Sequence, residues 1–160
     1  MSWGANSSGQ LGRGTVSESE CEAKQVVGGE TVVKVVGGGA HTLATNLDGH
    51  LLTWGSNSAG QLGLDGGGDM SVPTLVTLPK GVVVADMAAG WDFSVLVDTE
   101  GCVWTCGGNV WGQLGTWGEG CYSRVAKHRQ NLFFQTICVK FFFLYCRLHN
   151  SLLEQISTKR

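Results

Sequence analysis

Short apolar runs, separated by glycine-rich and polar segments, make up the first 120 residues of the chain. The runs are five to eight residues long and rich in valine, and turn-forming residues bound most of them, which is typical of β-strands. Several runs are apolar on both faces, as expected where sheets stack face to face. A short strand is expected to lead into Trp3, and the polar residues 15–30 are expected to form a loop. The other predicted strands are residues 31–36, 41–47, 50–54, 72–78, 82–89, 92–97 and 102–106.

A ten-residue motif, Trp-Gly-x-Asn-x-x-Gly-Gln-Leu-Gly, organises these runs into a repeat. It occupies residues 3–12 and 54–63 and returns in a weaker form at 106–115, so the copies are 51 and 52 residues apart. Self-similarity at a fixed period of about this length signals blades, coils or arrays. We therefore predict an all-β fold, an incomplete β-propeller of about two to three four-stranded blades. The predicted units are a partial blade at 1–14 and repeats at 15–66 and 67–118.

The repetition of the motif indicates that its residues build the same turn in every blade. Glycine and asparagine tolerate positive φ, and the glutamine of each copy is expected to bond with backbone groups of the loop. Trp3, Trp54 and Trp104 lie near strand ends and are expected to pack in the core. In the middle copy the motif residues are Trp54, Gly55, Asn57, Gly60, Gln61, Leu62 and Gly63.

The composition of the chain changes at residue 120, and we assign residues 121–160 to a divergent apolar and basic tail. All 25 glycines precede residue 121, and residues 1–120 carry four Lys+Arg against twelve Asp+Glu. The tail carries seven basic residues and one acidic residue, and its apolar run at 132–146 is short for a membrane helix. Membrane contact by the tail is not expected, and residues 147–156 are predicted to form an amphipathic helix. Two interpretations stand: a non-native terminus, such as an alternative exon, or a membrane-surface or partner-binding tail. A separate hypothesis is that the apolar run of the tail covers an open blade face.

Charge and motif content exclude several classes of function. The acidic repeat region lacks the clustered Lys and Arg of a nucleic-acid surface. No phosphate-binding loop and no nucleophile–base pair stands out, so we expect neither direct nucleotide binding nor covalent catalysis, and no cofactor. The N-terminus lacks a secretory pattern, so the six cysteines are expected to be reduced thiols without a metal, in a cytoplasmic or nuclear protein.

The motif, with the Gly-x-x-His and Asp-Gly turns before it, resembles the regulator of chromosome condensation repeat. The resemblance covers residues 1–120 and none of the tail. It implies a seven-bladed propeller and guanine nucleotide exchange on small GTPases, an activity best known in that family. The sequence Gly90-Trp91-Asp92-Phe93-Ser94 replaces the usual Gly-x-x-His, and it is similar to the subfamily of secretion-regulating guanine nucleotide exchange factors.

Three residues are candidates for binding a partner protein, and each has a structural alternative. His41 occupies the Gly-x-x-His position: its ring either bonds within the blade or lies near the loop face that meets the GTPase in the family. Asp92 is interpreted as the equivalent residue of the next repeat, pairing with a basic partner group or accepting N–H groups of its own turn. Trp91 is either an exposed anchor or packed between blades.

Two function classes follow. The first is an exchange-factor-like protein that binds a small GTPase and regulates secretion, present here as a truncated isoform or fragment. The second is a non-catalytic propeller scaffold for protein–protein interaction.

Overall fold

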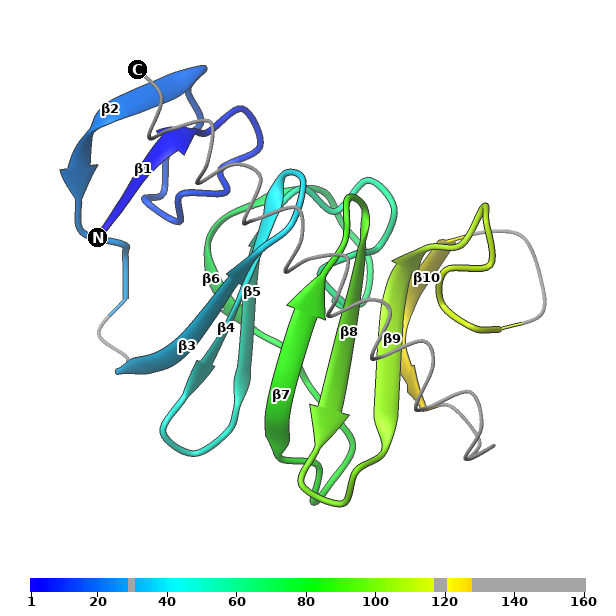
Figure 1. Cartoon of the computed structure of the whole chain (residues 1–160). Helices are drawn as coiled ribbons and strands as arrows, with labels where there is room; N and C mark the ends of the chain where they lie inside the picture. Colours follow the sequence, from blue (N-terminus) through cyan, green and yellow to red (C-terminus); the bar gives the residue numbers. More distant parts are fainter. Residues whose placement is uncertain (29–30, 117–120, 128–160) are drawn as a thin grey trace, which may run out of the picture. The chain divides into compact units, whose positions relative to one another are not determined.

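The computed structural model describes residues 1–28, 31–116 and 121–127 (Figure 1). Every regular element among these residues is a β-strand, so the all-β prediction is confirmed for this part of the chain. The expectations about residues 128–160 lie outside the described residues. No helix in the described ranges is long and apolar enough to cross a membrane. The strands are β1 (Ser2–Ala5), β2 (Ser19–Lys24), β3 (Val32–Gly37), β4 (His41–Asn46), β5 (Leu51–Gly55), β6 (Met70–Leu75), β7 (Val84–Ala89), β8 (Phe93–Asp98), β9 (Val103–Gly108) and β10 (Cys121–Lys127).

The strands form three antiparallel sheets in chain order. β1 and β2 form an N-terminal pair, β3 to β6 form the second sheet, and β7 to β10 form the third sheet. The Asp48-Gly49 and Glu100-Gly101 turns join neighbouring strands as the sequence predicts. The turns after β3 and β7 lie at the same end of their sheets as the motif loops, and we call this the motif-loop end (Figure 1).

The sheets do not follow the predicted limits of the repeat. β6 pairs with β5, so the strand after each motif loop closes the preceding sheet and does not open the next one. β10 likewise pairs with β9, which places residues 121–127 in the third sheet, beyond the predicted boundary at residue 120. The motif therefore connects the last two strands of a blade. Each copy of the motif lies within one sheet and does not mark the boundary between two sheets.

β2 was predicted as loop and is a strand that pairs with β1. Its side chains are almost all exposed on both faces, so it has no alternation of apolar and polar residues to reveal it. An edge strand of this kind is held by backbone hydrogen bonds to its neighbour, a pairing that the local sequence does not encode.

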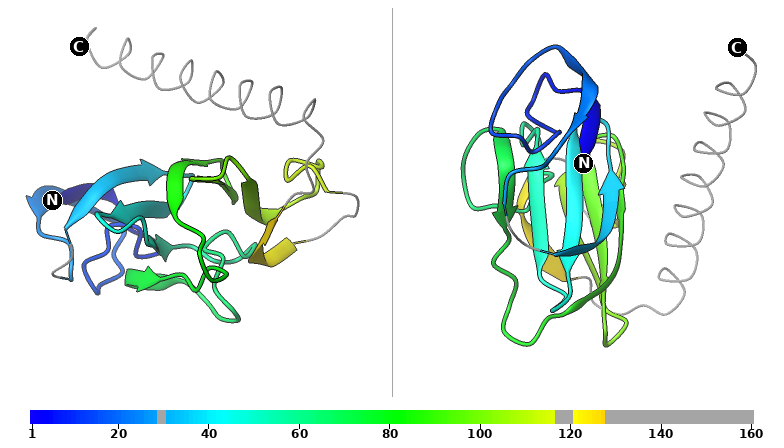
Figure 2. Two further views of the ribbon diagram at one scale, coloured as in Figure 1. Left: turned by 90° about the horizontal axis from the view of Figure 1, so that it is seen from below. Right: turned by 90° about the vertical axis from the view of Figure 1, so that its left-hand side faces the viewer.

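Two apolar clusters fill the spaces between sheets. Figure 2 shows the arrangement of the strands from two further directions. Leu43 and Leu51 of the second sheet pack against Met87, Leu96 and Trp104 of the third sheet. A smaller cluster, Ala44, Leu52 and Trp54 with the half-buried Val26, joins the second sheet to the N-terminal segment. The predicted core positions of Trp54 and Trp104 are confirmed.

The prediction that Trp3 packs in the core is wrong, because this residue is 64% exposed. The face of β1 that carries Trp3 has no further sheet against it among the described residues. Trp3 is exposed because its cover depends on a neighbouring sheet, whereas the second sheet buries Trp54 against the N-terminal segment.

Candidate functional site

Each copy of the motif folds into the same closed turn. Asn57 Oδ1 accepts the backbone N–H of Leu62 at 3.1 Å, and Gln61 Oε1 accepts that of Ala59 at 2.8 Å. Gly60 has a φ of +81°, in the left-handed region that favours glycine. The same pair of bonds recurs in the other two copies at 2.8–3.1 Å. The motif residues therefore stabilise their own loop.

The backbone carbonyl of the motif glutamine also links one sheet to the next. Gln10 O accepts the hydroxyl of Thr42 at 2.9 Å and the indole N–H of Trp54 at 2.8 Å. Gln61 O accepts the hydroxyl of Ser94 at 2.7 Å, and the thiol of Cys106 lies 3.5 Å away. We call each such contact between consecutive sheets a seam. The motif therefore joins blades as well as closing its own turn.

His41 lies in the seam between the second and third sheets, where its side chain is 1% exposed. Its Nε2 is 3.0 Å from Ser94 Oγ, whose proton is donated to Gln61 O, so Nε2 carries the ring proton and donates to Ser94. Nδ1 is buried and has no hydrogen-bond partner among the described residues. Burial lowers the pKa of His41 to about 4, so the ring is neutral at pH 7. The structure places His41 between blades, away from the loop surface.

The residue equivalent to His41 in the third sheet is Phe93, and the assignment to Asp92 is corrected. His41 pairs with Gly55 across the sheet, and Phe93 pairs with Gly107. The turn bonds agree, since Gly38 N donates to His41 O and Gly90 N donates to Phe93 O, both at 2.8 Å. The spacing of 52 residues between the last two motif copies gives the same register.

Trp91 and Asp92 form the turn between β7 and β8 at the motif-loop end. Trp91 is 81% exposed, and its backbone carbonyl is 3.2 Å from the N–H of Gly39, which donates to it. Asp92 is half-buried, and its carbonyl accepts the N–H of Gly108 at 2.9 Å. A Cβ on Gly108 would lie 2.3 Å from Asp92 Oδ2, so the carboxylate rests directly over that glycine.

Val110 and Trp111 extend this surface, and the sequence reasoning did not single them out. They occupy the variable positions of the third motif copy and are exposed, Trp111 to 89%. The other copies have small residues there: Ser7 and Ser8, and Ser58 and Ala59. A comparison of the variable positions between copies would have found the change.

Four residues of these two adjoining turns, Trp91, Asp92, Val110 and Trp111, define a candidate binding surface, which we call the aromatic loop patch. The bond between the Asp92 carbonyl and Gly108 fixes the turn against the start of the third motif loop. Two largely exposed tryptophans and a carboxylate on adjoining turns suit a protein partner with an apolar surface and a basic group, since aromatic residues dominate interface hot spots.

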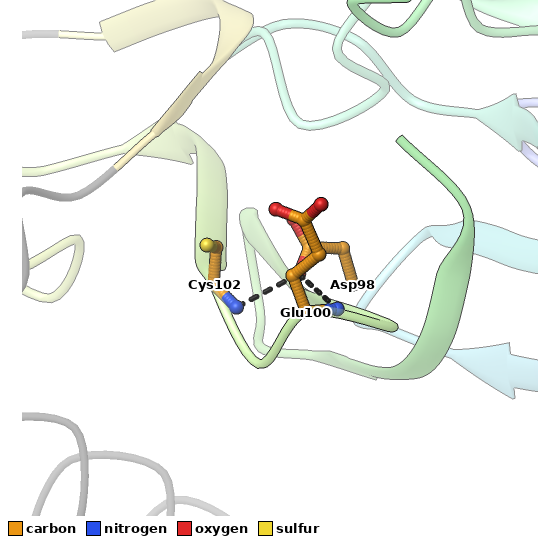
Figure 3. A group of neighbouring side chains, drawn as sticks. All are labelled: Asp98, Glu100 and Cys102. Carbon is orange, nitrogen blue, oxygen red and sulfur yellow. Dashed lines mark hydrogen bonds between the residues drawn. The ribbon is translucent and has the colours of Figure 1, made fainter. Parts of the chain in front are cut away.

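A group of possible metal ligands, Asp98, Glu100 and Cys102, lies at the opposite end of the third sheet (Figure 3). Asp98 Oδ1 accepts the backbone N–H groups of Glu100 at 3.0 Å and Cys102 at 2.8 Å. Asp98 Oδ2 accepts the indole N–H of Trp104 at 2.8 Å. Because hydrogen bonds already occupy both carboxylate oxygens, the arrangement is a turn that Asp98 closes.

The second sheet has the same turn with an amide in place of the carboxylate. Asn46 Oδ1 accepts the N–H groups of Asp48 at 3.1 Å and His50 at 2.9 Å. Asn46 precedes Asp98 by the 52 residues that separate the last two motif copies. The repeat therefore forms this hydrogen-bonded turn with either an amide or a carboxylate at its first position.

Two family models describing the regulator of chromosome condensation (RCC1) repeat match the chain. One matches residues 2–45 and 48–97, and the other matches residues 32–61 and 84–113. Together they include the three sheets up to the third motif loop.

Curated relatives with different functions share this repeat. The ultraviolet-B receptor UVR8 of Arabidopsis thaliana is 38% identical over 116 residues, covering 72% of this chain and 26% of the receptor. The secretion-regulating guanine nucleotide exchange factor of Bos taurus is 36% identical over 118 residues, covering 72% of this chain and 25% of that protein. The chain thus spans about a quarter of the length of these relatives.

A solved structure with the same fold is that of Prp20p from Saccharomyces cerevisiae, described together with its binding properties to Gsp1p and histones. The TM-score is 0.70 at 21% identity, and the match covers 81% of this chain and 34% of Prp20p. The likeness confirms that the three sheets are blades of an incomplete propeller, as predicted.

Proposed function

Because the chain belongs to the regulator of chromosome condensation repeat family, we propose that it is an exchange-factor-like protein that binds a small GTPase through the aromatic loop patch. The exposure of Trp91 and Trp111 at neighbouring turns carries the proposal. Support also comes from the relative named as a secretion-regulating exchange factor, and we extend the proposal to a role in secretion. A cytoplasmic or nuclear location belongs to the same proposal.

Such an activity needs no covalent chemistry from the chain. An exchange factor binds the nucleotide-free GTPase more tightly than the loaded one, and this difference in affinity speeds nucleotide release. Protein–protein interfaces of this kind bury about 1,600 Å² in total. A patch on one blade supplies part of that area, so we expect this chain to retain binding better than it retains exchange.

The second candidate is a scaffold that binds proteins without promoting exchange. The observation that favours it is the identity to a relative named as a receptor, which is as high as the identity to the exchange factor. A scaffold would use the same exposed tryptophans and need not bind a GTPase, so the two candidates differ in whether the chain speeds nucleotide release.

The test measures binding and exchange together on the 160-residue chain. A panel of small GTPases, each loaded with a fluorescent GDP analogue, is titrated with the chain while nucleotide release and complex formation are recorded. The proposal expects binding to at least one GTPase and faster release from it. Binding to a GTPase without faster release favours the scaffold, and no binding to any GTPase contradicts the proposal of a GTPase partner.

Substitutions test whether the patch is the surface that binds. Trp91→Ala and Trp111→Ala should each weaken binding by roughly tenfold or more, as expected for exposed aromatic anchors. Leu47→Ala is the matched control, because Leu47 is 75% exposed in the turn between β4 and β5, away from the motif-loop end. Equal effects of all three substitutions would exclude the patch as the binding surface.

A further inference from the structure

Two aspartates of the chain precede a glycine, and the fold holds the two pairs differently. Asp48-Gly49 lies in the turn between β4 and β5, and Asp65-Gly66 lies in the connection from the second motif loop to β6. An Asp-Gly sequence readily closes into a five-membered succinimide ring, because glycine has no Cβ to hinder the attack of its nitrogen on the aspartate side chain. In a folded chain, the reaction depends on how freely the peptide between the two residues can turn.

The peptide between Asp48 and Gly49 is fixed in its turn. Gly49 is buried, and its N–H donates to the carbonyl oxygen of Asn46 at 3.1 Å. The Gly49 carbonyl accepts the N–H of Val84 at 3.1 Å, and a Cβ on Gly49 would lie 2.4 Å from a methyl carbon of Val83. Turning this peptide toward the Asp48 side chain would break the bond to Asn46 in a place that is already filled.

The peptide between Asp65 and Gly66 has no such restraint. Residues 65–69 are all exposed, and no hydrogen bond from the Gly66 N–H is present in the described part of the chain. Nothing lies within 4 Å of the Cβ position of Gly66, whose φ is +75°. Gly67 and Gly68 follow, so the backbone after the peptide can also rotate without steric cost.

The two ends of this exposed loop are nevertheless attached to the rest of the fold. Leu64 is half-buried against the apolar cluster between the second and third sheets. At the other end, Asp69 Oδ1 accepts the backbone N–H of Asn57, in the second motif loop, at 2.9 Å. A change of backbone length between Leu64 and Asp69 would therefore act on the motif loop through this bond.

We propose that Asp65 is a site of spontaneous isomerisation to isoaspartate in the folded chain. The nitrogen of Gly66 attacks Cγ of Asp65 in its carboxylic acid form, and the acid hydroxyl and the amide hydrogen leave together as water. Water then adds to the main-chain carbonyl carbon of Asp65 and opens the ring there. The product has the same mass as the original chain, but its backbone passes through Cβ and Cγ of residue 65 and is one methylene longer.

The first experiment follows both Asp-Gly pairs in the full 160-residue chain during storage for weeks at neutral pH. Peptide mapping separates the isomers, and an endoproteinase that cleaves before aspartate does not cut at isoaspartate. Isoaspartate should accumulate at Asp65 at least roughly tenfold faster than at Asp48, because the Gly49 peptide must first give up its hydrogen bond. An equal or lower rate at Asp65 would overturn the proposal.

The unfolded chain is the matched control for the effect of the fold. In concentrated urea the bond from Gly49 to Asn46 is lost, so the two pairs should isomerise at similar rates. A tenfold difference that persisted in urea would mean that the flanking sequence, and not the fold, selects Asp65. In heavy-oxygen water each isoaspartate should carry at least one heavy oxygen, and its absence would contradict the succinimide route.

Asp65→Glu tests the consequence for the motif loop, because a glutamate keeps the charge but would need a six-membered ring, which closes more slowly. The variant should show little isomerisation at residue 65 after the same storage. Hydrogen exchange at the Asn57 amide should be faster in the isomerised chain than in the stored variant, since the longer backbone shifts Asp69 away from it. Equal exchange would overturn the effect on the motif loop.

Discussion

The buried imidazole of His41 makes the stability of this chain depend on pH. A free histidine has a pKa near 6.5, and burial lowers the pKa of His41 to about 4, so the unfolded chain takes up the proton first as the pH falls. Stability from this residue is complete above about pH 6.5 and is lost as the pH falls toward 4. Urea unfolding should show a loss of about 2 kcal/mol between pH 7.5 and pH 5.

His41→Phe is the control for this pH dependence, because Phe93 occupies the same place in the third sheet. The variant should lose most of the difference between pH 7.5 and pH 5, while carboxylates continue to titrate at lower pH. If the variant loses as much stability as the parent chain over this range, His41 is not the group responsible.

Gly55 is a residue at which the backbone requires glycine for two separate reasons. Its φ is +99°, and a Cβ would lie 2.5 Å from the carbonyl oxygen of Ala40 and 2.7 Å from Cα of His41. Gly55→Ala should therefore lower the free energy of unfolding by about 3 kcal/mol or more, from strained φ and a backbone clash.

Gly66 separates these two costs. It also has a positive φ, of +75°, but nothing lies within 4 Å of its Cβ position. Gly66→Ala should cost only about 1 kcal/mol, the cost of left-handed backbone alone. Chemical denaturation of the two variants measures the difference, and equal losses would mean that the close approach at Gly55 relaxes without cost.

At the scale of strands and turns, a strand can be predicted when its signal lies in neighbouring residues, but not when it depends on pairing with a strand elsewhere in the chain. The hairpin strands around Asp48-Gly49 and Glu100-Gly101 were predicted because apolar runs and turn residues are local signals. β2 and β10 were not, because their assignment depends on pairing with β1 and β9 across loops. An exposed edge strand can be polar throughout.

The candidate site could be predicted only in part for a related reason. Trp91 and Asp92 were identified through a departure from the repeat, and their turn is at the motif-loop end. His41 was assigned a possible surface role, but the neighbouring sheet buries it, and no signal within its own repeat reveals that. Val110 and Trp111 required a comparison of variable positions between copies.

The turn that Asp98 closes provides a prediction at this scale. Asp98→Ala leaves the backbone N–H groups of Glu100 and Cys102 and the indole of Trp104 without their acceptor, so it should cost about 2–3 kcal/mol. Asp98→Asn keeps the oxygen that closes the turn, as Asn46 does in the second sheet, but its amide nitrogen cannot accept the indole N–H of Trp104, so it should cost about 1–2 kcal/mol, less than Asp98→Ala. Thermal unfolding distinguishes the two. A similar loss from both would mean that the two bonds to the turn N–H groups contribute little, and that the oxygen facing Trp104 or the negative charge accounts for the stability.

For the molecule as a whole, the two apolar clusters predict unequal stability along the chain. The larger cluster joins the second and third sheets, so they should unfold as one cooperative unit. The N-terminal pair is attached through the smaller cluster around Trp54 and through Gln10. Its amides should therefore open at a lower free energy than those of β4, β5 and β8.

Trp54→Phe tests this hierarchy, because it keeps an aromatic ring in the smaller cluster and removes the indole N–H that reaches Gln10 O. The loss of about 1 kcal/mol in stability should affect only the seam between the first and second sheets. Native-state hydrogen exchange should show faster exchange in β1 and β2 and unchanged protection in β8. Leu96→Ala is the matched substitution in the larger cluster and should lower protection throughout the second and third sheets, by about 2–5 kcal/mol. If Trp54→Phe lowered protection equally in β1 and β8, the blades would form a single cooperative unit, and the seams would not be separable elements of stability.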